Sequence, residues 1–306
     1  MTERLELCIA DITIAVSSLD LDLKFWVGGG NKKFIVEEVA PNIKLWVSWS
    51  ELCEEISGEK IFDSGLLWKL YELNGFYLFR FASPALGSSP YKIAKMQKDF
   101  KWGEVFLHRP YFDPGLAVYP LEYPLDELLF INFLAIGKGV EIHASGVIDL
   151  FGQGHLFVGQ SGAGKTMMAN LWKDAPGITV LSDDRIILRK MENTIWMYGT
   201  PWHGEAGLAS PAKALLTGIY FLEHGEENKL VLHKPAPSLG RLFACIFPPF
   251  YSREGVDFTL GFLEDVVRNV PCYELKFKPD KSVVELITNN EHFHMTPAER
   301  KRNAKI

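Results

Sequence analysis

Residues 159–166 read Gly-Gln-Ser-Gly-Ala-Gly-Lys-Thr, which has the spacing G-x-x-x-x-G-K-[ST] of a phosphate-binding loop. In such a loop the glycines let consecutive backbone N–H groups point at phosphate oxygens. An apolar strand pattern at residues 155–158 enters the loop, and a helical pattern at residues 167–172 leaves it. The alternative is a glycine-rich turn followed by an ordinary lysine, but strand, loop and helix all fall where the motif requires them.

The motif predicts a nucleotide and Mg²⁺ as the ligands of this loop, and does not distinguish ATP from GTP. In this kind of loop the lysine reaches the β- and γ-phosphates and the Ser or Thr hydroxyl ligates the metal. We therefore expect Lys165 to act in catalysis as well as in binding, and Thr166 to ligate Mg²⁺. The residues assigned to the nucleotide are Gly159, Gln160, Ser161, Gly162, Ala163, Gly164, Lys165 and Thr166.

Two consecutive aspartates follow the next apolar stretch. Residues 178–181 predict a strand that ends at Ser182, Asp183 and Asp184. The connection from the loop strand is long enough for a right-handed strand–helix–strand unit, which would bring both aspartates beside Lys165. Phosphoryl transfer needs a carboxylate for Mg²⁺ and often a second one as base, so we expect Asp184 as metal ligand and either aspartate as base. Because adjacent strand residues point to opposite faces, both can serve only if the strand ends or bends here; otherwise one of them caps the following turn.

Other candidates carry weaker signals. His143 lies at the end of a predicted strand upstream of the loop, although a lone histidine is more often a packed or surface residue. Residues 199–205 place His203 and Glu205 with two glycines in one loop, which suits either a substrate-facing segment or a structural turn. Arg241 could neutralise charge in the transition state, as a substrate-side candidate, or lie on a helix surface.

Composition excludes several classes of protein. The net charge is −6, with Lys and Arg scattered along the chain, so we expect no nucleic-acid partner and no anionic membrane surface. Cys8, Cys53, Cys245 and Cys272 are isolated and are expected to be free thiols. The first residues lack the apolar core of an export signal, and the longest apolar run is about half the ~20 residues that span a bilayer. We therefore expect a cytoplasmic enzyme.

The chain predicts two domains and a tail. Residues 1–122 predict a β-rich domain of unknown role, with strands at residues 34–39, 43–49, 75–81 and 103–108 and one helix at residues 91–100. Residues 123–295 predict the phosphate-loop domain, with strands at residues 140–143 and 147–150. Residues 296–306 predict a polar tail. The expected fold class is α/β, α+β overall, with the mixed sheet in the C-terminal domain.

Four segments together resemble the HPr kinase-like branch of the phosphoenolpyruvate-carboxykinase-type P-loop proteins, over roughly residues 126–290. They are Ile142-His-Ala-Ser, the loop at 159–166, Leu181-Ser-Asp-Asp-Arg, and Gly199-Thr-Pro-Trp-His-Gly-Glu. The resemblance implies a compact mixed sheet flanked by helices, with ATP·Mg²⁺ at Lys165 and Thr166. It also implies that His143 lies at the transferring phosphate and that Asp183 or Asp184 is the base toward a serine hydroxyl. Met167 stands where HPr kinases have an acidic residue, so the resemblance favours a substrate other than HPr.

The sequence thus predicts an ATP- and Mg²⁺-dependent kinase of the HPr kinase-like type, whose acceptor is a serine of a protein or peptide. The alternatives are a small-molecule kinase or carboxykinase-like phosphotransferase, and a non-catalytic regulator that binds a nucleotide. Both aspartates disfavour the regulator, because binding alone needs no base. By analogy with the resembling family we also expect a homo-oligomer.

Overall fold

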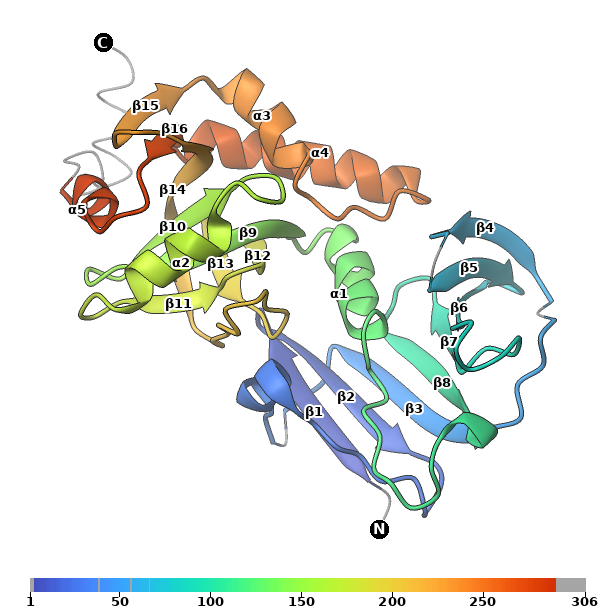
Figure 1. The fold of residues 1–306 in the computed structure, drawn as a ribbon. Helices are drawn as coiled ribbons and strands as arrows, with labels where there is room; N and C mark the ends of the chain where they lie inside the picture. Colours follow the sequence, from blue (N-terminus) through green and yellow to red (C-terminus); the bar gives the residue numbers. More distant parts are fainter. Residues whose placement is uncertain (1–2, 38, 56, 66, 290–306) are drawn as a thin grey trace. The chain divides into compact units, whose positions relative to one another are not determined.

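The computed structural model describes residues 3–289 except residues 38, 56 and 66. It shows a mixed α/β protein with two large mixed sheets, each of eight strands, and few helices (Figure 1). The predicted tail at residues 296–306 lies outside the described residues. No helix in the described part of the chain combines the length and the apolar character needed to cross a membrane.

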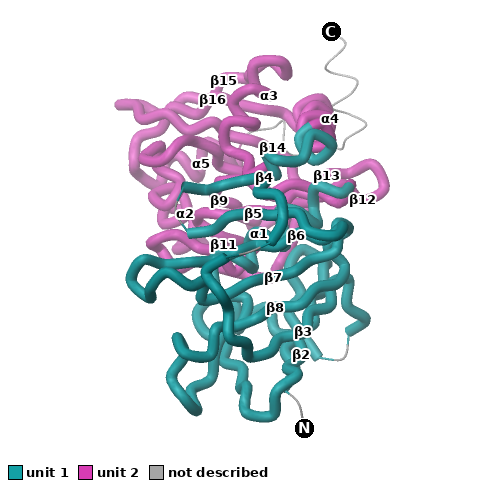
Figure 2. Tube along the Cα trace, turned by 90° about the vertical axis from the view of Figure 1, so that its right-hand side faces the viewer, with its two compact units in different colours: residues 1–136, 249–256 teal, residues 137–248, 257–306 magenta. Residues whose placement is uncertain are grey.

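The chain divides into two units, coloured separately in Figure 2. Unit 1 consists of Met1–Ile136 and Pro249–Val256, and unit 2 consists of Gly137–Pro248 and Asp257–Ile306. The first boundary between the units therefore follows residue 136, whereas the sequence predicted a domain boundary after residue 122. Unit 1 also takes in a short segment from the predicted phosphate-loop domain.

Unit 1 contains the first sheet, whose strands lie in the order β1-β2-β3-β8-β7-β6-β5-β4. Its helix α1, Leu125–Ala135, has ten buried residues and is preceded by the 3-10 turns η1, Gly29–Phe34, and η2, Arg109–Tyr111. The strands are β1 Arg4–Ile9, β2 Ile12–Ser18, β3 Ile43–Ser50, β4 Glu59–Asp63, β5 Trp68–Leu73, β6 Phe76–Phe81, β7 Lys92–Gln97 and β8 Trp102–His108.

Two sequence predictions in unit 1 are wrong. The helix expected at residues 91–100 is strand β7, because Lys92, Ala94 and Met96 alternate inward while the strand pairs with both β6 and β8. The strand expected at residues 34–39 is absent from the described part of that range, where Phe34 ends η1 and Ile35 forms an isolated bridge to Leu7. Between β1 and β2, Ala10 and Asp11 both have positive φ, as a two-residue type I′ hairpin turn requires.

Unit 2 contains the second sheet, in the order β10-β9-β12-β13-β14-β16-β15, with β11 paired to β9. Since β10 also pairs with β14, five strands close a circuit of hydrogen bonds. The strands are β9 Val140–Ile148, β10 Gln153–Val158, β11 Thr179–Ser182, β12 Arg185–Met191, β13 Thr194–Gly199, β14 Lys213–His224, β15 Lys229–His233 and β16 Cys272–Phe277.

The helices of unit 2 pack on two separate apolar clusters. Met168 and Trp172 of α2, Lys165–Lys173, share one cluster with Val283 and Ile287 of α5, Ser282–Thr288. The other cluster holds residues of α3, Pro235–Phe243, and α4, Arg253–Asn269. The strand–loop–helix order predicted around residues 159–166 is therefore present as β10, the loop and α2.

The sequence missed three features of the second sheet. The two short strands expected at residues 140–143 and 147–150 are the single strand β9. Strand β14 is a long apolar run without alternation, which periodicity does not distinguish from a helix, and it lies buried between β10 and β16. Strands β10 and β11 are not hydrogen-bonded to each other, since β9 lies between them and is antiparallel to both.

Lys92 is a buried cation in the core of unit 1. Its side chain is 1% exposed, its Nζ donates to the carbonyl oxygen of Glu122 at 2.8 Å, and it lies over the rings of Phe81 and Tyr91 at 5.0 and 5.7 Å. Burial lowers the pKa of Lys92 to about 8, and the charges of Glu122 and Asp126 only partly oppose that shift. Folding therefore favours the neutral amine.

We expect this lysine to make the stability of unit 1 rise with pH. Between about 8 and 10.5 the unfolded chain binds more protons at Lys92 than the folded chain, so the free energy of unfolding increases by up to about 1.4 kcal/mol per pH unit. Urea unfolding of wild type and Lys92→Met across this range measures the effect. The difference between the two proteins should depend on pH; a constant difference contradicts the assignment.

Candidate functional site

The loop between β10 and α2 has a backbone that only glycine allows at its two fixed positions. Gly164 has a φ of +99°, and a Cβ there would lie 2.6 Å from the Phe277 ring. A Cβ on Gly159 would lie 2.5 Å from Cβ of Ala163. Gly162, at a φ of +83°, accepts a contact from Nε2 of His224 through its carbonyl oxygen at 3.0 Å. The loop is thus tightly held by its own residues and by the ends of β14 and β16.

Helix α2 starts from this loop without a side-chain cap. Its N-cap residue is Gly164, in the left-handed region, which makes no side-chain capping hydrogen bond to the first turn. The N–H groups of a first turn carry the partial positive charge of the helix N-terminus and suit an anion. Lys165 and Thr166, in the first turn, lie at this end of the helix.

Lys165 folds back onto the loop that precedes it. Its Nζ donates to the carbonyl oxygens of Gly159 and Gln160 at 2.8 and 3.1 Å, and the residue is 6% exposed. Burial lowers the pKa of Lys165, and the charge of Asp184 acts in the opposite direction. The ammonium is therefore held among carbonyl oxygens and interacts with a carboxylate from another part of the chain.

Asp184 lies between a histidine and an arginine. Its Oδ1 is 3.0 Å from Nε2 of His143, and its Oδ2 pairs with the guanidinium of Arg185. Burial acts to raise the pKa of Asp184, but the His143 hydrogen bond and the charges of Arg185 and Lys165 outweigh it and lower the pKa. The carboxylate is ionised at neutral pH and about a quarter exposed, with a relative side-chain exposure of 28%.

The neighbouring Asp183 has a different environment. It is fully buried, and its carboxylate accepts the backbone N–H groups of Gly204, Ala206 and Leu208 at 3.1, 3.0 and 3.3 Å. Asp183 therefore fixes the loop that follows β13. The aspartates differ because β11 ends at Ser182 and β12 starts at Arg185, leaving the two residues in the bend between them.

His203 and Glu205, the substrate-side candidates of that loop, are exposed. His203 contacts only its neighbour, through Nδ1 and the Gly204 carbonyl oxygen at 3.0 Å, among the bonds seen for the described residues. Arg241 lies elsewhere, on α3, where it pairs with Glu223 at 3.4 Å and Glu274 at 3.8 Å and covers the Phe221 ring. The structure therefore gives Arg241 partners other than the residues around Asp184.

Sequence reasoning missed the residues that hold Arg185. Its Nε is 3.5 Å from Glu141, whose side chain is buried, and its guanidinium lies 4.4 Å from the centre of the Phe247 ring. The main chain of His143 donates to the carbonyl oxygen of Cys245 at 2.7 Å. Glu141 stands two positions before His143 on β9, and Arg185 directly follows the aspartates. Their closeness in sequence to predicted site residues is the signal that could have identified them.

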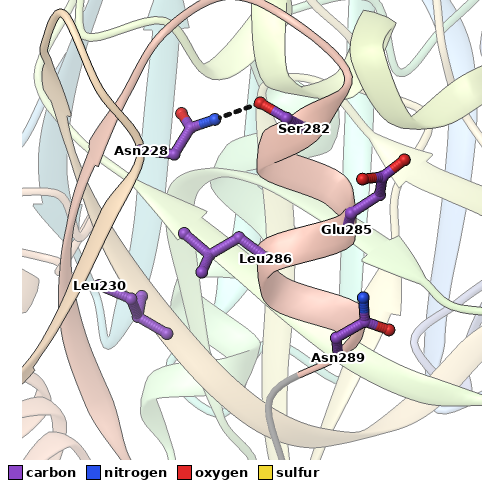
Figure 3. Close-up of a pocket in the computed structure, with 6 residues that line it drawn as sticks. All are labelled: Asn228, Leu230, Ser282, Glu285, Leu286 and Asn289. Carbon is purple, nitrogen blue, oxygen red and sulfur yellow. Dashed lines mark hydrogen bonds between the residues drawn. The ribbon is translucent and has the colours of Figure 1, made fainter.

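No group of three or more His, Cys, Asp and Glu side chains within the described residues could hold a metal ion by itself. All four cysteines are free thiols, as expected. A separate pocket of 610 Å³ lies between β15 and α5 and contains none of the predicted site residues (Figure 3). Its lining consists of Asn228, Leu230, Ser282, Glu285, Leu286 and Asn289.

The chain was compared with family models, curated proteins and solved structures. No family model matches the chain, and no curated protein matches its sequence. Among solved structures, the chain is similar to the HPr(Ser) kinase/phosphatase from Coxiella burnetii, with a TM-score of 0.33 and 13% sequence identity. The match covers 51% of this chain and 97% of that chain. At this identity and TM-score the similarity by itself supports no shared activity.

The environments of the two aspartates predict different effects on stability. Asp183→Ala should lower the free energy of unfolding by about 2–4 kcal/mol, because it leaves three backbone N–H groups without their acceptor. Asp184→Ala should cost about 1 kcal/mol or less, since the carboxylate is partly exposed and Arg185 keeps Glu141. Urea unfolding measures both variants, and equal losses would contradict the distinction.

Proposed function

We propose that this chain is an ATP- and Mg²⁺-dependent kinase that transfers the γ-phosphate to a serine hydroxyl of a protein or peptide. The observation that carries the proposal is the Asp184 carboxylate, which His143 and Arg185 hold and which interacts with Lys165 of the glycine-rich loop. A loop that binds phosphate needs a cationic side chain and free N–H groups, and a transfer reaction needs an ionised carboxylate near them. These parts occur together in unit 2.

The loop would bind the phosphates of the nucleotide. The N–H groups at the start of α2 would donate to phosphate oxygens, and Lys165 would exchange the carbonyl oxygens of Gly159 and Gln160 for the β- and γ-phosphates. The Thr166 hydroxyl and the Asp184 carboxylate fit Mg²⁺, which usually takes one or two protein ligands together with substrate phosphates. When bound, Mg²⁺ would neutralise charge on the phosphates.

Asp184 is the better candidate for the base, because three backbone N–H groups occupy the carboxylate of Asp183. Each oxygen of Asp184 has one partner, so each keeps a second lone pair for a further contact. In the transfer, the serine oxygen would form a bond to the γ-phosphorus while the bond from that phosphorus to the leaving ADP oxygen breaks. The serine proton would pass to Asp184, which His143 and Arg185 keep unprotonated, and so able to accept a proton, before the transfer.

Positioning and charge neutralisation would supply most of the catalysis. The exposed loop with His203 and Glu205, fixed by Asp183, is the segment we assign to contact with the acceptor. Action in the cytoplasm, assembly as a homo-oligomer, and the absence of a nucleic-acid or membrane partner stay predictions from the sequence.

An assay of phosphate transfer and nucleotide binding distinguishes the role of Lys165 from that of Asp184. Purified protein is incubated with γ-labelled ATP, Mg²⁺ and cell extract, and labelled phosphoserine and nucleotide binding are both measured. Asp184→Asn should reduce transfer by a factor on the order of 10²–10⁴ and weaken nucleotide binding less than Lys165→Ala does, because it removes the base but keeps the loop and one side-chain oxygen for Mg²⁺. Lys165→Ala should weaken nucleotide binding about tenfold or more. Asp265→Asn is the matched control, since Asp265 is a partly exposed carboxylate of unit 2 paired with Lys190.

Three results would contradict parts of the proposal. Tight nucleotide binding without transfer to any acceptor would favour a regulator. Label on a small molecule instead of a protein or peptide would favour a metabolite kinase. Absence of nucleotide binding in the wild type would remove the phosphate-loop assignment itself.

A further inference from the structure

The outer face of the unit 1 sheet carries large apolar side chains where a solvated face usually carries polar ones. On β3, β5, β6, β7 and β8 one set of alternating residues is buried, including Leu45, Leu70, Phe79, Ala94 and Val105. The alternate set is partly exposed. Its large apolar members include, in chain order, Trp46, Tyr71, Phe76, Leu78, Ile93, Trp102 and Phe106.

The strand register makes this set one continuous surface. One row of paired residues runs Trp46, Glu104, Lys95, Leu78, Tyr71 and Lys60 across six strands. The adjacent row runs Ser48, Phe106, Ile93, Arg80, Lys69 and Asp63. Directly opposite Cβ atoms on neighbouring strands lie about 5 Å apart, so the side chains of each row are in reach of one another. We call these two rows, with Lys44 and Trp102, the outer face.

Cations are interleaved with the rings on the outer face. Five of its residues are Lys or Arg and two are Asp or Glu, which leaves three positive charges on a chain whose net charge is −6. Lys95 pairs with Glu104 at 3.0 Å and lies 4.7 Å from the centre of the Phe76 ring. Lys69 and Lys60 share Asp63 at 3.1 and 3.2 Å. The surface therefore combines aromatic contact area with excess positive charge.

We infer that the outer face docks an acidic peptide segment of a protein partner, one in which carboxylates and apolar side chains alternate at every second position. Contiguous apolar area on a soluble protein marks an interaction site, and aromatic side chains flanked by cations supply both contact area and charge selection. Every second residue of an extended segment points the same way, so such a segment presents both carboxylates and apolar side chains to the cationic and apolar positions of a row. The inference uses no residue of the phosphate loop, so it stands or falls separately from the kinase proposal.

Charge argues against the other occupants. A second copy in a two-fold dimer would place this face on itself, and its excess positive charges would then oppose one another. A nucleic acid carries one phosphate per nucleotide along its whole length, while the chain as a whole is acidic. A short acidic segment needs to match only the local cations.

Fluorescence anisotropy of a labelled peptide tests the inference on the full chain. The probe contains three Asp-Ser-Trp-Ser repeats, in which acidic and aromatic side chains alternate along one face of the extended peptide, and its control has Lys at each acidic position. We expect the acidic peptide alone to bind, and Lys44→Glu combined with Arg80→Glu to weaken its binding about tenfold or more. Lys24→Glu combined with Lys98→Glu makes the same change of charge in unit 1 away from the outer face, and should leave binding unchanged.

Thermal melting checks that the variants fold, and Trp46→Ser provides a second test that leaves the charges intact and should also weaken binding. Equal binding of the acidic and basic peptides would overturn the inference. So would tighter binding of a single-stranded oligonucleotide of the same length, or a dimer in solution that the Lys44→Glu, Arg80→Glu variant abolishes.

Discussion

The bend between β11 and β12 is the constraint on which the candidate site depends. Both strands pair with β9, but their pairing is interrupted between Ser182 and Arg185. The two consecutive aspartates therefore lie outside the regular strand conformation. One carboxylate is satisfied by backbone N–H groups of the loop after β13, and the other remains with His143 and Arg185. A continuous strand would alternate the two side chains between the faces of the sheet and give neither of them this environment.

Strand β9 aligns the parts of the site, because it pairs with β10, β11 and β12. It places His143 opposite Arg185 in register, and it lies beside the strand that leads into the glycine-rich loop. The loop itself is held from the other side by Phe277 and His224, at the ends of β16 and β14. The positions of Lys165 and Asp184 thus follow from a rigid sheet, which limits how much either group must reorganise when an anion binds.

The sequence predicted the parts of this arrangement that depend on local chain. The glycine-rich loop could be predicted because its residues are contiguous and its conformation is set by glycine backbone angles. The sequence could not predict that the two aspartates have different environments. Backbone N–H groups within residues 204–208 hold Asp183, and a β-bridge between Ser182 and Ala209 brings those residues close to it. Glu141, Arg185 and Phe247 come from three separate segments, and only tertiary packing joins them. Strand β7 was mistaken for a helix because cross-strand pairing outweighs the local preference of its residues.

The central claim is that the loop at residues 159–166 binds the phosphates of a nucleotide beside Asp184. The most direct measurement is a crystal structure of the full chain with Mg²⁺ and a non-hydrolysable ATP analogue. We expect the β- and γ-phosphates at the N-terminus of α2, with Nζ of Lys165 moved from the carbonyl oxygens of Gly159 and Gln160 to the phosphates. A nucleotide bound away from this loop, or Lys165 still on those carbonyl oxygens with the analogue present, would contradict the claim.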